Sequence, residues 1–163
     1  MPLRQSKQRL MPSFETRRQV PFTPQEMFAL VADVERYPEF LPLCEGLRVL
    51  SRNDEGDQQA LVAVMDVGYK GLKETFTSRV TLDETVPTLR TDLVEGPFTR
   101  LVNKWDFSET PGGCEVKFFI DYEFKSMLLQ MLVGGLFQQA FGRFAEAFEE
   151  RAHTIYGRRA GVA

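Results

Sequence analysis

The strongest constraint on the fold is a regular alternation of apolar and polar residues from Cys114 to Phe124. Every second residue there is apolar, and most of the intervening residues are charged. A period of two places alternate side chains on opposite faces of a β-strand. The stretch from Leu101 to Phe107, which includes Trp105, repeats the pattern. We therefore predict an amphipathic sheet with one apolar face and one face toward water.

Turn-forming residues divide the chain from Gly46 to Phe124 into about six short strands. The breaks fall at Asn53–Gly56, Gly68–Gly71, Thr85–Pro87, Glu95–Pro97 and Thr110–Gly113. Connections this short leave no room for crossover helices, so consecutive strands are expected to pair antiparallel. A further strand is expected earlier, from about Ser13 to Val20.

Two helices flank the predicted strands. Thr23, Pro24 and Glu26 form a capping-box signature for a helix that runs to about Asp33. Ser126 is placed to cap a second helix from about Met127 to Tyr156. Its second half carries an apolar stripe at spacings of three and four: Phe137, Phe141, Phe144, Phe148, Ala152 and Ile155. This stripe predicts that the helix packs on the apolar face of the sheet.

Composition narrows the functional classes. The chain has 163 residues, a net charge of −3 and 43% hydrophobic residues, which favours one ordinary folded domain and argues against a general nucleic-acid binder. Its two cysteines lack metal-ligand spacing, so we expect reduced thiols and no metal site. The sequence contains no apolar window of 18 residues.

The expected domain runs over residues 12–157. Residues 1–11 carry Arg4, Lys7 and Arg9 without an acid, which indicates a flexible basic tail or, alternatively, a short part of an organelle-targeting sequence. Residues 158–163 are expected to form a flexible C-terminal tail.

The usual catalytic signatures are missing from the sequence. His153 is the only histidine, and its charged neighbours indicate a solvated surface residue or a partner of the helix dipole. Glu74 shares the parity of Leu72 and Phe76, so it lies either on the apolar face as a site residue or at the sheet rim with its carboxylate in water. We therefore expect a protein that is not an enzyme.

The connection between the first helix and the strands, DVERYPEFLPLCEG (Asp33–Gly46), introduces a family resemblance. It belongs to a set of short motifs: Asp33-Val34, Tyr37-Pro38, Phe40–Pro42, Cys44, Glu95–Phe98, Trp105 with Phe107, Phe124–Ser126, Phe148 with Arg151-Ala152, and Tyr156-Gly157. Together they resemble the coenzyme Q-binding protein family, whose bacterial branch includes RatA-type ribosome-association toxins. The order of elements is similar to the α+β helix-grip fold of the START and Bet v 1 superfamily, which polyketide cyclases share.

The resemblance implies a curved antiparallel sheet of about six or seven strands wrapped around a long C-terminal helix. It also implies non-catalytic binding and chaperoning of ubiquinone (coenzyme Q) in a hydrophobic tunnel, in support of respiratory electron transport and without a required cofactor. The ligand-binding residues that it implies are Leu41, Leu43, Phe76, Trp105, Phe118, Leu136, Phe137, Ala140, Phe141 and Phe144.

The first turns of the last helix have scarcely any polar side. Met127, Leu128, Met131 and Leu132 are the expected contacts with a membrane, a respiratory complex or a second copy of the chain. The expected location is cytoplasmic, with peripheral contact at the inner membrane, or the matrix side of that membrane in a eukaryote.

Two other functions stay open at this point. The first is a RatA-type toxin that binds the large ribosomal subunit and blocks subunit association, with Arg79, Arg90, Arg100 and Lys104 supplying part of a basic surface. The second is an enzyme of the polyketide cyclase type, which the lack of an inward histidine makes the weakest hypothesis.

Overall fold

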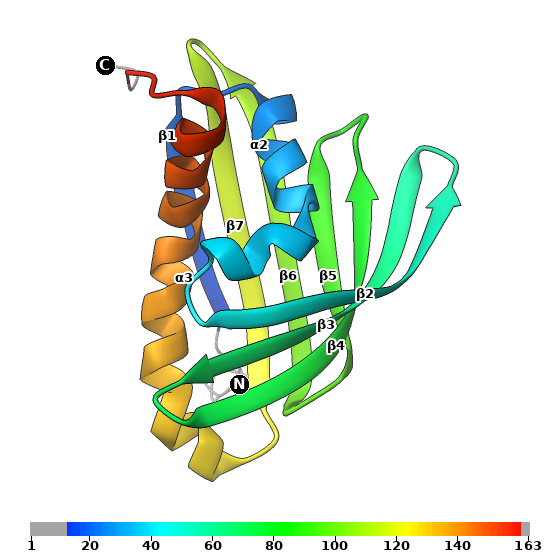
Figure 1. The fold of residues 1–163 in the computed structure, drawn as a ribbon, viewed down its shortest axis with the longest axis vertical. Helices are drawn as coiled ribbons and strands as arrows, with labels where there is room; N and C mark the ends of the chain where they lie inside the picture. The colour runs from blue at the N-terminus through cyan, green and yellow to red at the C-terminus, as the bar shows by residue number, and fades with distance from the viewer. Residues whose placement is uncertain (1–12, 161–163) are drawn as a thin grey trace, which may run out of the picture.

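The computed structural model describes residues 13–160, which form a seven-stranded antiparallel sheet curved around a long helix (Figure 1). The strand order across the sheet is β1-β7-β6-β5-β4-β3-β2. This is the predicted helix-grip architecture. The predicted tail 1–11 and residues 161–163 of the predicted C-terminal tail lie outside the described residues.

The strands follow the predicted turn signals closely. They are β1 (Ser13–Val20), β2 (Cys44–Glu55), β3 (Gln58–Tyr69), β4 (Leu72–Asp83), β5 (Thr88–Glu95), β6 (Phe98–Thr110) and β7 (Gly113–Phe124). From β2 to β7 each strand pairs antiparallel with the next, as expected from the short connections. β1 pairs with β7, in a register that runs from Ser13 opposite Asp121 to Val20 opposite Cys114.

The β3–β4 hairpin closes on two residues in the left-handed region. Lys70 has φ 48° and Gly71 has φ 87°. Positive φ at both central residues matches the right-handed twist of paired strands, which is why two-residue hairpins favour it. The turn places Tyr69 and Leu72 side by side at the hairpin tip, opposite each other in the register.

The first helix, α2 (Pro24–Ala32), has the predicted capping box. Thr23 Oγ1 accepts a hydrogen bond from the Glu26 backbone N–H at 3.0 Å, and the Glu26 carboxylate accepts one from the Thr23 backbone N–H at 2.9 Å. A 3₁₀ helix, η1 (Val34–Glu39), occupies the first half of the connection that follows. Backbone bonds from Arg36 N–H to the Asp33 carbonyl and from Phe40 N–H to the Tyr37 carbonyl define this turn type.

The long helix α3 (Met127–Tyr156) has the predicted bounds and the predicted cap, since Ser126 Oγ accepts from the Leu129 N–H at 3.2 Å. Its second half packs against β1, β7 and α2. Phe148 and Ala152 of the apolar stripe are buried, whereas Ile155 is 51% exposed. In that turn the neighbouring Tyr156 contacts α2 instead, because its hydroxyl donates to the Glu26 carbonyl at 3.1 Å. The core therefore lies between α3 and the concave face of the sheet.

Candidate functional site

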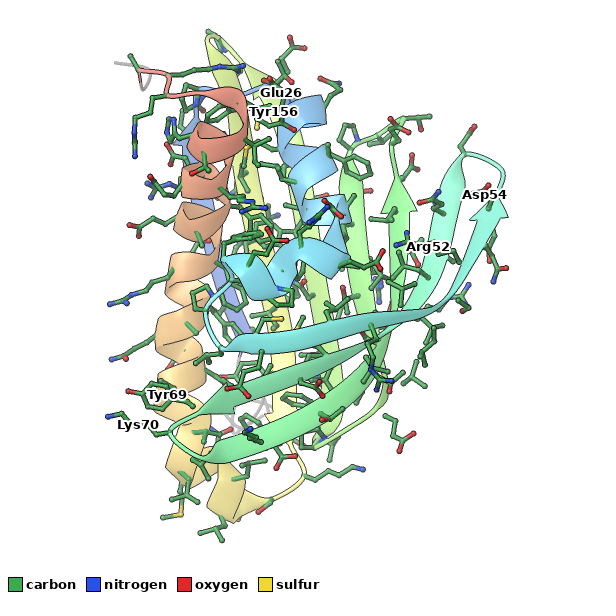
Figure 2. All side chains as sticks on the ribbon, in the orientation of Figure 1. Glu26, Arg52, Asp54, Tyr69, Lys70 and Tyr156 are labelled. Carbon is green, nitrogen blue, oxygen red and sulfur yellow. The ribbon has the colours of Figure 1, made fainter. Side chains whose placement is uncertain are left out.

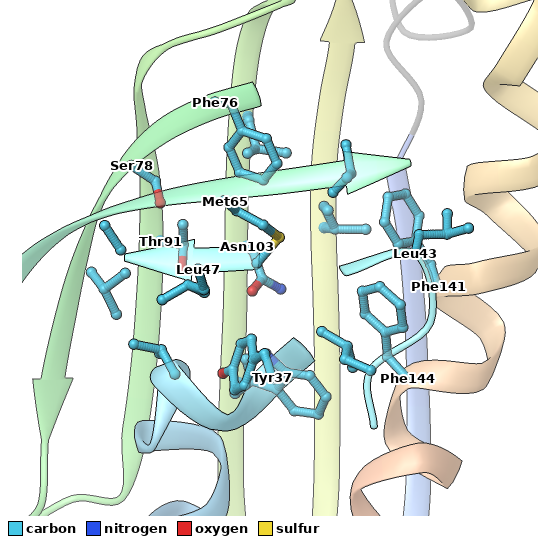
Figure 3. A pocket seen from close by; sticks show the side chains of 18 of the residues that line it. Tyr37, Leu43, Leu47, Met65, Phe76, Ser78, Thr91, Asn103, Phe141 and Phe144 are labelled. Carbon is cyan, nitrogen blue, oxygen red and sulfur yellow. The ribbon is translucent and has the colours of Figure 1, made fainter. Parts of the chain in front are cut away.

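An apolar cavity of about 110 Å³ lies between the concave sheet face, α3 and the connection that contains η1 (Figure 3). The sheet supplies its floor, because the inward residues of β3 to β7 alternate with outward polar ones. Tyr37 and Leu41 cover it from the connection. The stretch that connects α2 to β2 thus helps to enclose the cavity, which accounts for its apolar residues Tyr37 and Leu41.

Most of the residues expected to bind a ligand meet at this cavity. Its lining includes Leu41, Leu43, Phe76, Trp105, Phe118, Phe137, Phe141 and Phe144. Leu136 lines a second, smaller pocket instead, and Ala140 is buried but belongs to the lining of neither pocket. That these residues bind a ligand stays a prediction.

The second pocket adjoins the cavity at the surface, between the β3–β4 hairpin and the first half of α3. Leu43, Val67 and Phe137 line both. Tyr69 at the hairpin tip (Figure 2) and Leu129 on α3 are among its lining residues. The two pockets together describe an apolar path from the centre of the molecule toward the start of α3.

Leu43 stands between the two pockets with its backbone in the left-handed region, at φ 69°. This conformation costs a residue with a Cβ about 1 kcal/mol. Its carbonyl accepts a hydrogen bond from the Gly68 N–H at 3.0 Å, which ties the connection to the end of β3. The strained residue therefore lies where the connection turns into the sheet and the cavity meets the outer pocket.

Tyr37 anchors η1 over the cavity. Its hydroxyl donates to the Val31 carbonyl, and its ring lies edge-on to Phe148 with 5.3 Å between centroids. Burial raises the pKa of Tyr37 far above its ordinary value of 10.0. The phenol is thus neutral and engaged at physiological pH, which suits a structural role.

Aromatic rings form one continuous wall of the cavity. Trp105 meets Phe118 at 4.7 Å between centroids, and Phe118 meets Phe141 at 6.2 Å. Phe141 in turn lies edge-on to Phe144 at 5.5 Å. Each such pair contributes about 0.5–1.5 kcal/mol beyond its buried area. Seven of the 14 phenylalanines of the sequence line this cavity.

Three polar residues in the lining were missed from the sequence. They are Ser78, Thr91 and Asn103. The signal that could have found them is parity: Ser78 falls between inward Phe76 and Val80. No charged side chain belongs to the cavity lining drawn from residues 13–160.

The titratable candidates lie elsewhere. Glu74 is half-buried at the rim, where it lines the second pocket. His153 is not the solvated residue that its neighbours suggested, because its ring packs edge-on to Phe22 at 4.9 Å and its Nδ1 accepts from the Arg159 N–H at 3.2 Å. The chain beyond α3 folds back over this histidine. Within the described chain no group of His, Cys, Asp and Glu is placed to hold a metal ion.

The start of α3 exposes large apolar side chains. Met127 is 84% exposed and Met131 80%, with Leu128 and Leu132 also exposed. Tyr69 and Leu72 at the neighbouring hairpin tip are exposed as well. No helix in the described part of the chain is long and apolar enough to cross a membrane. We define the apolar rim as the six exposed residues Tyr69, Leu72, Met127, Leu128, Met131 and Leu132.

The expected basic surface on the outer sheet face is mostly paired with acids. Arg79 contacts Glu55 at 3.2 Å, and Arg90 contacts Asp92 at 2.9 Å. Arg100 contacts Asp121 at 2.6 Å. Lys104 instead lies 5.8 Å from the centroid of the Phe119 ring. The outer face is thus mixed in charge.

A curved sheet that grips a long helix around an enclosed apolar cavity defines a START-like, helix-grip protein. The model of the polyketide cyclase / dehydrase and lipid transport family matches residues 20–149, and the chain belongs to this family. A solved START superfamily protein from Mycobacterium smegmatis superposes with a TM-score of 0.70 at 23% identity, covering 89% of this chain and 98% of that one, which supports the fold.

Two relatives bear on function. The chain is 34% identical over 151 residues to the ribosome association toxin RatA of Escherichia coli, with 92% of both chains covered. It is 27% identical over 145 residues to the mitochondrial coenzyme Q-binding protein COQ10 of Dictyostelium discoideum, covering 88% of this chain and 70% of the relative. The sequence resembles both the RatA-type toxins and the coenzyme Q-binding proteins, and both are present among its relatives.

Proposed function

We propose that the protein associates with the ribosome, binding the large subunit and blocking its joining with the small one. The observation that carries this proposal is the 34% identity with a ribosome association toxin over 92% of both chains. This match is stronger and more complete than the 27% identity with the coenzyme Q-binding relative. The bacterial relative also favours a cytoplasmic location.

The outer sheet face offers the residues for such a contact. Arg79 and Arg90 are held by exposed ion pairs, which contribute only about 0–1 kcal/mol each. A phosphate or an acidic ribosomal surface can therefore replace Asp92 as the partner of Arg90 with little loss of free energy. Lys104, opposite Arg90 in the β5–β6 register, has no carboxylate partner within residues 13–160.

Co-sedimentation with purified large subunits tests this proposal. We expect binding at low salt that weakens as salt rises, and a further loss in the double variant Arg90→Gln and Lys104→Gln. Arg52→Gln, which removes a paired arginine from the β2–β3 hairpin away from this surface, is the matched control (Figure 2). Failure of the wild-type protein to sediment with the subunits in low salt would reject the proposal.

The cavity favours a second candidate function, the binding of ubiquinone or a related polyprenyl lipid. Its lining is apolar apart from Ser78, Thr91 and Asn103, and one relative is named for binding coenzyme Q. The volume of about 110 Å³ is below the roughly 300–1,000 Å³ of ordinary ligand sites, so binding requires the lining phenylalanines to move apart. The ring and nearer isoprenes then fit inside, and the tail leaves through the second pocket.

In this second role we infer a carrier without catalysis or a required cofactor. Among residues 13–160 the cavity lining contains no charged group that could transfer a proton to or from a bound molecule. The apolar rim beside the second pocket supplies a surface for transient contact with the inner membrane or with respiratory complexes. Delivery of ubiquinone there would support respiratory electron transport.

Organic extraction followed by mass spectrometry tests the second candidate. Protein purified from cells that make ubiquinone should carry it at near-stoichiometric amount, and Phe141→Trp, which fills the cavity, should remove it. Leu50→Ala, at an exposed position of β2, is the control that should retain it. Empty wild-type protein, or a mixture of unrelated lipids, would contradict this candidate and leave the ribosome proposal untouched.

A further inference from the structure

The three polar residues of the cavity lie on three neighbouring strands. Thr91 of β5 is paired with Asn103 of β6 on one side and with Val80 of β4 on the other. Ser78 is two residues from Val80 along β4, so it shares the same face. The three side chains therefore form one polar row across an otherwise apolar floor.

Much of the hydrogen-bonding capacity of this row is unused by the protein. Asn103 Nδ2 donates to the Phe119 carbonyl at 2.8 Å, which fixes the amide and leaves its Oδ1 directed away from that bond. The hydroxyls of Ser78 and Thr91 make no hydrogen bond to another residue of the described chain, and Ser78 is only 6% exposed. Buried polar groups are stable when they are bonded. A molecule in the cavity that bonds to this row would stabilise it.

The row also determines the kind of head group that fits. Two hydroxyls and an amide can donate to and accept from oxygen atoms of a ligand. A carboxylate or phosphate would be buried without a counter-charge, because the described lining has no Lys, Arg or His. The fitting head group is uncharged and carries carbonyl, ether or hydroxyl oxygens.

The position of the row gives the ligand a direction. In the close view Ser78 and Thr91 lie on the side of the cavity opposite Leu43 and Phe141 (Figure 3). Leu43 is one of the three residues that also line the second pocket. A ligand bonded to the row therefore points its apolar tail toward Leu43 and the start of α3.

We propose that Ser78, Thr91 and Asn103 recognise the uncharged, oxygen-bearing head group of a lipid whose tail leaves the cavity past Leu43. This inference rests on the second candidate function, lipid binding in the cavity. It adds to that function a head-group class and an orientation.

The single tryptophan provides the test, since Trp105 is buried in the cavity wall. Titration with decylubiquinone should quench its fluorescence, and competition with squalene should report the binding of a pure hydrocarbon. Thr91→Val should raise the Kd for decylubiquinone about 3- to 10-fold, the effect of one neutral hydrogen bond, and leave squalene binding unchanged. Thr91→Ser, which keeps the hydroxyl, should restore the affinity. Thr81→Val on the outer face is the matched control.

The possible outcomes distinguish this inference from the lipid-binding function on which it rests. Wild-type affinity for decylubiquinone in both Thr91→Val and Asn103→Leu, with squalene still competing, would overturn the polar row and leave lipid binding intact. Binding of decanoate as tight as that of decylubiquinone would overturn the uncharged head group. Failure of the wild-type protein to bind either decylubiquinone or squalene would overturn lipid binding and this inference together.

Discussion

Trp105 of β6 and Phe148 of α3 meet edge to face, with ring centroids 5.0 Å apart and ring planes at 76°. Phe148 also contacts Phe40 at 5.0 Å between centroids, so the sheet, the long helix and the connection after α2 converge on one side chain. It is 1% exposed. The enclosure of the cavity thus depends on packing around Phe148.

Removing that ring should be severely destabilising. Phe148→Ala is expected to lower the free energy of unfolding by about 3–5 kcal/mol, because it leaves a cavity among rigid aromatic neighbours. Urea unfolding followed by Trp105 fluorescence measures the change. Ile155→Ala, on the same helix but 51% exposed, should change it by no more than about 0.5 kcal/mol. A loss below about 1 kcal/mol for Phe148→Ala would contradict this account of the core.

Glu26 should make the stability depend on pH in the acid range. Arg159 donates to both carboxylate oxygens at 2.7 and 2.9 Å, and these hydrogen bonds, with the Thr23 N–H, lower the pKa of Glu26 below its ordinary 4.5. A depressed pKa in the folded state gives stability that is present above the unfolded pKa and lost as pH falls through the folded one. Glu26→Gln should therefore destabilise the protein at pH 7, and the difference from wild type should shrink as pH falls through the folded pKa of Glu26.

That comparison requires only unfolding curves of the two proteins at each pH. The amide introduced by Glu26→Gln retains one acceptor oxygen for the Thr23 N–H but loses the second oxygen, which accepts from Arg159. The difference between the two proteins therefore reports the charge together with that hydrogen bond. A difference in the free energy of unfolding between wild type and Glu26→Gln that persists unchanged at pH 3 would show that ionisation of Glu26 does not cause the pH dependence.

Both cysteines should resist modification in the native protein. Burial raises the pKa of Cys44 to about 11 and that of Cys114 to about 12, so neither forms the reactive thiolate at neutral pH. A thiol-specific disulfide reagent at pH 7.5 should label neither residue within the time that labels both in urea. Rapid labelling of Cys44 in native conditions would reveal frequent opening of the connection next to it.

The apolar rim should mediate membrane contact if it acts as proposed. Met131→Glu places a charge on a side chain that is 80% exposed, so folding should be unaffected. Flotation with phosphatidylcholine–phosphatidylglycerol vesicles should fall about tenfold, in line with the roughly 1.5–3 kcal/mol of a buried apolar side chain. Gln138→Glu adds the same charge elsewhere on α3 and should float like wild type. Equal flotation of wild type and Met131→Glu would exclude the rim as the contact.

The fold was largely predictable because its signals are local. Turn residues mark each hairpin, Thr23 and Ser126 cap the two helices, and the period changes from two to 3.6 after Phe124. The 3₁₀ helix after α2 was not predicted, since Pro38 argues against a regular helix. A short 3₁₀ turn nevertheless tolerates Pro38, which lacks only one donor.

The candidate site was less predictable because it depends on how distant strands align. Phe76, Trp105 and Phe118 were expected at the cavity from parity and family resemblance, and they line it. The pairing of Thr91 with Asn103 depends on the β5–β6 register, which no local motif specifies. His153 was misjudged for a similar reason. Besides the charged Glu149, 3.4 Å from its Nε2, its neighbours in space include the Phe22 ring and the backbone of Arg159, which no local pattern indicates.

The pairing of β1 with β7 has a consequence for how the molecule assembles. Ser13 lies opposite Asp121, so the first described strand completes its hydrogen bonds only with the last one. Closing so long a loop is slow compared with forming the hairpins between them. During synthesis β1 therefore stays unpaired until β7, the last strand of the sheet, has been synthesised. Docking of that strand is expected to be among the latest steps of folding.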